Sequence, residues 1–97
     1  MVAVPGVFAL HQNYPNPFNP VTTIRYDVPE QAHVTMEIYN LLGQKVATLV
    51  NGIQEPGYHA IMWNGTNMSG AAMSSGMYFY HIQAGDFRSV KKLILVK

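Results

Sequence analysis

Apolar and polar residues alternate along most of this chain, with the period of two that is typical of β-strands that bury one face. In the stretch TTIRYDV, Ile24, Tyr26 and Val28 fall on one face, and charged or hydroxyl side chains fall on the other. Five further stretches alternate in the same way: HVTMEIYN (33–40), QKVATLV (44–50), YHAIMW (58–63), MYFYHIQA (77–84) and SVKKLILV (89–96). We therefore predict strands in all of these stretches, since none of them follows the 3.6-residue period of a helix.

The spacing of these stretches predicts an all-β fold, an immunoglobulin-like antiparallel β-sandwich of about seven strands. Ile24, Ile38, Trp63 and Leu93 lie on the apolar faces of four different stretches and are expected in the core. Trp63 is the only tryptophan and offers a large apolar ring to a thin sandwich. The longest loop is expected at residues 64–75, which are rich in asparagine, serine, glycine and alanine.

The stretch NYPNPFNP, residues 13–20, holds three prolines and three asparagines. Proline lacks an amide donor and is confined to strand edges, strand starts and bulges, while the residue before it is extended. We therefore predict an extended, kinked first strand, held by the asparagines and pinned to the sandwich by Tyr14 and Phe18. Residues 17–20 also match the P-x-x-P pattern of polyproline ligands, so a peptide ligand or a linker is the alternative.

Composition places the chain among folded single domains. Of its 97 residues, 48% are hydrophobic and 11% are charged, a balance that excludes a disordered chain. The net charge of +1 does not indicate nucleic-acid binding. No apolar run approaches the roughly 18 residues of a membrane span. We expect residues 1–9 to be the remnant of a linker and residues 10–97 to form the domain, as a piece from the C-terminus of a larger exported protein.

Candidate chemistry is sparse in this sequence. The four histidines are widely separated, the five acidic residues are not adjacent, and no serine lies in a G-x-S-x-G turn. There is no cysteine, so thiolate metal sites and disulfides are excluded. The loop from Asn64 to Ser69 offers oxygens to Ca²⁺ but contains no carboxylate. We therefore expect no catalytic, cofactor-binding or metal-binding residues, and no enzyme.

Five segments in this order carry a resemblance to a known family: NYPNPFNPVTTIRYDVP (13–29), VTMEIYNLLGQKVATLVN (34–51), PGYHAIMWNGTNMSG (56–70), SSGMYFYHIQAGDF (74–87) and KKLILVK (91–97). Together they resemble the type A C-terminal sorting domain of the type IX secretion system, which ends many secreted proteins of Bacteroidetes and related bacteria. The signature is also similar to the immunoglobulin-like domain of flagellar hook-capping proteins. One departure is Asn64, where the family often has aspartate.

The resemblance implies a non-catalytic sorting module that directs an attached cargo through the type IX secretion system. The cargo would pass through the periplasm and the outer membrane to the cell surface or exterior. The implied partners are the outer-membrane secretion machinery, a sortase-like peptidase and an upstream cargo domain in the same chain. The recognition residues carried over from the family are Gly43, Gln44, Val46, Lys91, Lys92 and Lys97.

Other interpretations stay open at this point. The basic C-terminal segment, with its lysines expected in solvent, is also typical of an ordinary solvated strand face. The domain could be a structural immunoglobulin-like spacer or a hook-capping-type assembly domain. It could also be an accessory carbohydrate-binding module that stacks sugars on Tyr58, Trp63 or Tyr78, although we expect these rings to pack in the core.

Overall fold

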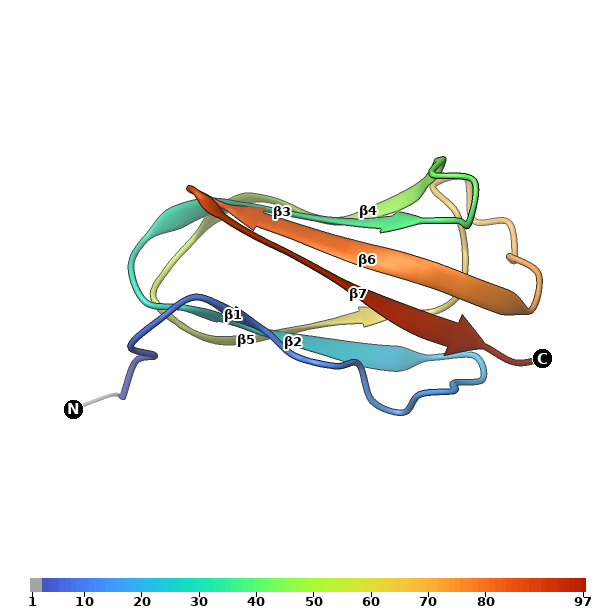
Figure 1. The fold of residues 1–97 in the computed structure, drawn as a ribbon, viewed down its shortest axis with the longest axis horizontal. Helices are drawn as coiled ribbons and strands as arrows, with labels where there is room; N and C mark the ends of the chain where they lie inside the picture. The colour runs from blue at the N-terminus through green and yellow to red at the C-terminus, as the bar shows by residue number, and fades with distance from the viewer. Residues whose placement is uncertain (1–2) are drawn as a thin grey trace.

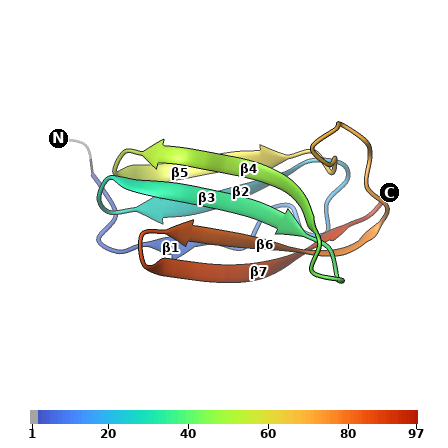
Figure 2. The same cartoon turned by 90° about the horizontal axis from the view of Figure 1, so that it is seen from above.

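A computed structural model describes residues 3–97 of the chain and shows two antiparallel sheets packed face to face (Figures 1 and 2). In the described residues the strands are β1 (Ala9–Leu10), β2 (Thr22–Val28), β3 (Ala32–Tyr39), β4 (Lys45–Gln54), β5 (Gly57–Trp63), β6 (Gly76–Ala84) and β7 (Phe87–Leu95). One sheet has the order β1-β2-β5 and the other the order β4-β3-β6-β7. The predicted all-β, immunoglobulin-like sandwich is confirmed.

The core between the sheets is built from the alternating faces that the sequence predicts. Ile24 and Ile38 are fully buried, as is Leu93 in β7, and Trp63 is 2% exposed. The Trp63 ring lies edge-on to Tyr78 at 5.5 Å between centroids and tilted against Phe18 at 5.7 Å. These contacts connect both sheets and the N-terminal segment, so Trp63 is the anchor that the sequence indicates.

The proline-rich segment runs along the outer edge of β7 and is part of the fold. Phe18 N–H donates to the carbonyl oxygen of Ile94 at 2.9 Å, and Val96 N–H donates to the carbonyl oxygen of Phe18 at 2.9 Å. The side-chain oxygen of Asn16 accepts from Ile94 N–H at 3.0 Å. These bonds occupy backbone groups that an edge strand otherwise leaves free, so the segment shields this edge. The prediction that residues 13–20 form the first strand is wrong, because these residues make only isolated bridges at Tyr14 and Phe18. The first strand, β1, lies earlier, at Ala9–Leu10.

The two aromatic residues of this segment behave differently from each other. Phe18 is 2% exposed and packs in the core, as predicted, but Tyr14 is 75% exposed. The prediction that Tyr14 pins the segment is therefore wrong for its ring. Its backbone does attach the segment, because Tyr14 N–H and C=O exchange hydrogen bonds with Thr23 at 3.0 and 2.9 Å.

The described residues that precede β1 also contact the sandwich. Pro5 is buried, and the ring of Phe8 stacks on that of Phe87 with 5.6 Å between centroids. The boundary at residue 10 stays a prediction. Within residues 3–97, no helix is long and apolar enough to cross a membrane.

Candidate functional site

The turn between β3 and β4, residues 40–44, contains Gly43 and Gln44, two of the residues that the family resemblance implies for recognition. Asn40 organises it: its side-chain oxygen accepts from Leu42 N–H at 2.9 Å and from Gln44 N–H at 3.0 Å. Its amide nitrogen donates to the Gln44 side-chain oxygen at 2.9 Å. Gly43 has φ = 80°, a left-handed conformation that side chains with a Cβ rarely adopt. The turn is therefore held in one shape by its own side chains.

This turn projects two leucines into solvent. Leu41 is 65% exposed and Leu42 is 83% exposed, which is unusual for large apolar side chains side by side. Their exposure is not evident from the residue type, because leucine is more often found in a core. The available signal was their position between Asn40 and Gly43, two residues that favour a tight turn.

Val46, the third residue of the recognition segment, lies in the core and is only 7% exposed. It is followed by Ala47, which is also buried, so two consecutive side chains face inward. The cause is an irregularity in the pairing of β3 with β4 between Ile38 and Tyr39, which interrupts the alternation. Val46 therefore lies in the core just after the turn, whereas Gly43 and Gln44 are exposed.

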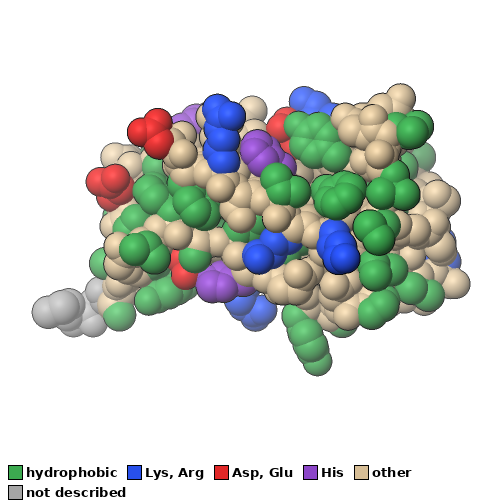
Figure 3. Space-filling model, viewed as in Figure 1, with side chains coloured by type: hydrophobic (Ala, Val, Ile, Leu, Met, Phe, Trp, Pro, Cys, Tyr) green, Lys and Arg blue, Asp and Glu red, His purple; other side chains and the backbone are tan. Residues whose placement is uncertain are grey.

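The three lysines of the C-terminal segment lie in different surroundings. Lys92 and Lys97 are exposed, as expected, but Lys91 shares the inward face of Leu93 and is half-buried. Figure 3 shows the side of the molecule that carries β7, where Lys and Arg side chains are separated by other residues and do not form one patch. The three lysines are therefore not equivalent. The prediction that they reach solvent is confirmed for Lys92 and Lys97 and only in part for Lys91.

The structure brings the turn and the C-terminus to the same end of the sandwich (Figure 1). Leu41 and Leu42 line a hollow of ≈ 210 Å³ together with Ser75. The hydroxyl of Ser75 accepts a 3.0 Å hydrogen bond from the backbone N–H of Lys97. The backbone of Lys97 is thus bonded to a residue that lines the same hollow as the two leucines.

Lys92 is joined to this end by a row of residues across the outer face of the four-stranded sheet. The pairing of the strands sets Lys45 beside Tyr39, Tyr39 beside Phe79, and Phe79 beside Lys92. Three strand spacings separate Lys45 from Lys92, roughly 14 Å. The row therefore has a positive charge at each end and two aromatic rings between them.

Lys45 is held in place at its end of that row. Its ammonium group lies 3.1 Å from a carboxylate oxygen of Glu37, and the Tyr39 hydroxyl donates to the other oxygen at 2.9 Å. Desolvation opposes ionisation of Glu37, but the hydrogen bonds from Tyr39 and Lys45 outweigh it and lower the pKa of the carboxyl below its ordinary value. Glu37 is therefore ionised at neutral pH and fixes both neighbours.

The three rings considered for carbohydrate stacking separate into two groups. Trp63 and Tyr78 are 2% and 4% exposed, so they pack in the core as expected and present no free face. Tyr58 is 66% exposed on the outer face of the three-stranded sheet, so the expectation of core packing is wrong for this ring. Two of the three proposed platforms are therefore inaccessible.

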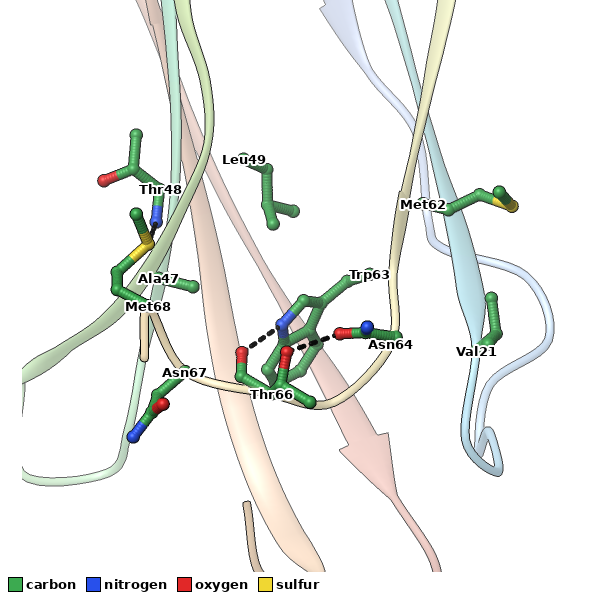
Figure 4. Close-up of a pocket in the computed structure, with 10 residues that line it drawn as sticks. All are labelled: Val21, Ala47, Thr48, Leu49, Met62, Trp63, Asn64, Thr66, Asn67 and Met68. Atoms are coloured by element: carbon green, nitrogen blue, oxygen red, sulfur yellow. Dashed lines mark hydrogen bonds between the residues drawn. The ribbon is translucent and has the colours of Figure 1, made fainter. Parts of the chain in front are cut away.

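The loop after Trp63 uses its own oxygens internally. The side-chain oxygen of Asn67 accepts from the backbone N–H groups of Ser69 and Ala71, each at 3.0 Å. Trp63 donates its indole N–H to the carbonyl oxygen of Thr66 at 2.9 Å, and Asn64 accepts from the Thr66 hydroxyl (Figure 4). Over residues 3–97, no group of three or more histidine or acidic side chains is placed to hold a metal ion.

Comparison with known families identifies the chain. Residues 12–97 match the family described as secretion system C-terminal sorting domain, and the chain belongs to that family. This family supplies the sorting signal of the type IX secretion system and is in general non-catalytic. The chain is accordingly a sorting module that directs attached cargo across the outer membrane to the cell surface or exterior.

Two solved structures share the fold. The crystal structure of dimeric latent PorU from Porphyromonas gingivalis matches with a TM-score of 0.75 and 24% identity, over 97% of this chain and 10% of that one. PorZ, an essential surface component of the type IX secretion system of the same organism, matches with a TM-score of 0.63 and 19% identity, over 91% of this chain and 11% of that one. The chain thus spans about a tenth of each. No curated protein matches the chain.

Proposed function

We propose that the secretion machinery recognises this sorting module at the end of the sandwich that carries the turn of residues 40–44. The observation that carries the proposal is the exposure of Leu41 and Leu42 on a turn fixed by three hydrogen bonds of the Asn40 side chain. A rigid apolar projection loses little conformational entropy when a partner covers it. Exposed apolar side chains grouped together are also typical of interaction surfaces.

In this proposal the recognition residues have different tasks. Gly43 permits the turn conformation, Gln44 closes it against Asn40, and Val46 anchors it in the core. Lys97 lies beside the same hollow and Lys92 ends the row of residues across the sheet, so both add positive charge near the contact. Lys91 is half-buried and contributes least.

We also propose how the module operates within the pathway. The domain itself catalyses nothing; it is bound by the outer-membrane machinery, and a sortase-like peptidase cuts the cargo from it ahead of β1. The match of residues 12–97 to the family supports this. The burial of Pro5 and the stacking of Phe8 on Phe87 also support a cut before residue 5, because a peptidase requires an accessible, extended backbone.

The test fuses the chain to a reporter protein in a type IX-competent cell and measures the reporter at the cell surface. The double variant Leu41→Asn/Leu42→Asn removes the apolar projection, and its surface delivery should fall at least tenfold. Its stability should change by less than about 0.5 kcal/mol, because both side chains are exposed. The control is Ile53→Asn, a 60% exposed apolar residue in β4, which should be delivered normally. Normal delivery of the double variant would refute recognition at this turn.

A second fusion tests the lysines. Replacing Lys91, Lys92 and Lys97 by glutamine keeps the strand and its buried leucines while removing the charge. Surface ion pairs contribute only about 0–1 kcal/mol, so the variant should fold. Its delivery should fall, and restoring Lys92 and Lys97 together should recover most of it. Recovery with Lys91 alone would contradict the assignment given above.

A further inference from the structure

The outer edge of β5 offers a row of free backbone groups. Thr23 in β2 turns its N–H and C=O away from β5, because both bond to Tyr14. Its partner in β5 is Met62, and the groups of Met62 therefore point away from β2. By the two-residue repeat of a strand, the groups of Ala60 and Tyr58 point in the same direction. Among residues 3–97, no other backbone group bonds to these three.

The other strand edges are each interrupted in a different way. Asn16 and Phe18 cover the edge of β7 around Ile94, the Gln12 side chain donates to the carbonyl oxygen of Lys92, and β1 has only two residues. The pairing of β4 with β3 is irregular at two points, and the sulfur of Met68 accepts from the N–H of Thr48 on the edge of β4 (Figure 4). By contrast, β5 pairs with β2 over seven residues without a register shift. Its sequence, GYHAIMW, contains no charged residue and no proline. Such an edge is prone to pair with another strand.

We propose that β5 pairs with β5 of a second copy of this chain, antiparallel and about a two-fold axis through Ala60. In that register Ala60 lies opposite Ala60 of the second copy, and Tyr58 lies opposite Met62. The residues brought together are those whose N–H and C=O groups point outward, so each pair can exchange two hydrogen bonds. The two three-stranded sheets then form one continuous sheet.

The side chains along β5 and the small net charge of the chain are also compatible with pairing between two copies. Tyr58 and Met62 are each 66% exposed on the outer face, and a sulfur–aromatic contact between them is favourable. Ala60 is small enough to meet itself at the axis. The net charge of +1 opposes self-association only weakly. The association goes beyond sorting, because it would present two cargo proteins together.

The test measures the mass of the 97-residue chain by sedimentation equilibrium at increasing concentration. A single strand pair is smaller than a standard interface of about 1,200–2,000 Å², so we use concentrations from about 10 µM to about 1 mM. The average mass should rise from the monomer value of 10.8 kDa toward twice that value. A mass that stays at the monomer value over the whole range would overturn the proposal.

Charge variants test the register itself. Ala60→Lys and Ala60→Glu each place like charges opposite each other at the axis, so each variant alone should stay monomeric. An equimolar mixture of the two should associate, because opposite charges then meet. Val90→Lys on β7 and the neutral Ala60→Gln are the controls and should associate like the original chain. Circular dichroism shows that each variant is folded. Unchanged association of Ala60→Lys, or a mixture that stays monomeric, would refute pairing about Ala60.

Discussion

The hydroxyl of Tyr80 donates a 2.6 Å hydrogen bond to the carbonyl oxygen of His11, which is 69 residues earlier in the chain. The same hydroxyl accepts from the N–H of Asn13 at 2.8 Å. Tyr80 is fully buried in β6, while His11 bonds through its own N–H to Arg25 of β2 in the opposite sheet. One side chain thus fastens the N-terminal segment between the two sheets, and the proline-rich stretch becomes a structural element of the domain.

Replacing this tyrosine tests the attachment. Tyr80→Phe leaves the carbonyl of His11 and the N–H of Asn13 without their partner in a buried place, which should cost about 1–3 kcal/mol of unfolding free energy. Tyr58→Phe is the matched control, since the Tyr58 ring is 66% exposed, and it should change stability by less than about 0.5 kcal/mol. Chemical denaturation measures both. Equal midpoints for the two variants would show that the segment is not fastened through Tyr80.

The same residue predicts a loss of stability at high pH. Burial raises the pKa of Tyr80 to about 12, although the hydrogen bond from Asn13 partly opposes the shift. The folded-state pKa lies above the ordinary value of 10.0, so keeping Tyr80 protonated in the core contributes to the free energy of unfolding. This stabilisation is complete below about pH 10 and is lost as the pH rises toward 12. A shift of this size corresponds to roughly 2–3 kcal/mol. Denaturation midpoints measured along this pH range should fall, and they should fall less in Tyr80→Phe.

The two aromatic residues of the proline-rich segment form a natural pair of variants. Phe18→Ala empties a core position against Trp63 and should cost about 3–5 kcal/mol. Tyr14→Ala removes an exposed ring, keeps the backbone bonds to Thr23, and should change stability by less than about 0.5 kcal/mol. A small effect of Phe18→Ala would support a loosely attached ligand or linker.

The glycine of the β3–β4 turn should be needed for its conformation and not for space. At Gly43 an added Cβ meets no atom within 4 Å, but φ = 80° disfavours any other residue, so Gly43→Ala should cost about 1–2 kcal/mol. Gly52→Ala is the control, because that position is equally open and has no positive φ. In a domain of this size 1 kcal/mol lowers the melting temperature by roughly 4–8 °C. Equal melting temperatures for the two variants would contradict the strained turn.

Much of this fold could be predicted because alternation directly reports which face is buried. The six predicted strands are present, with ends that differ by a few residues, and Ile24, Ile38, Trp63 and Leu93 are in the core. Alternation fails where pairing is irregular, and Val46 and Ala47 are buried in succession for that reason.

Other features depend on information that alternation does not contain. A proline-rich segment has no fixed period, so the sequence could not show which of its two rings faces inward. Tyr58 alternates like a core residue in a strand that buries only its other face. The exposed pair Leu41 and Leu42 looks like part of an apolar strand until the turn formed by Asn40 is seen.

The most direct test of the sorting function follows a reporter protein that carries this chain at its C-terminus. The reporter should appear at the surface of a type IX-competent cell, and it should remain in the periplasm when the chain is deleted or when the outer-membrane translocon is absent. A reporter that carries the intact, folded chain and still remains in the periplasm of competent cells would contradict the sorting function and favour a structural spacer.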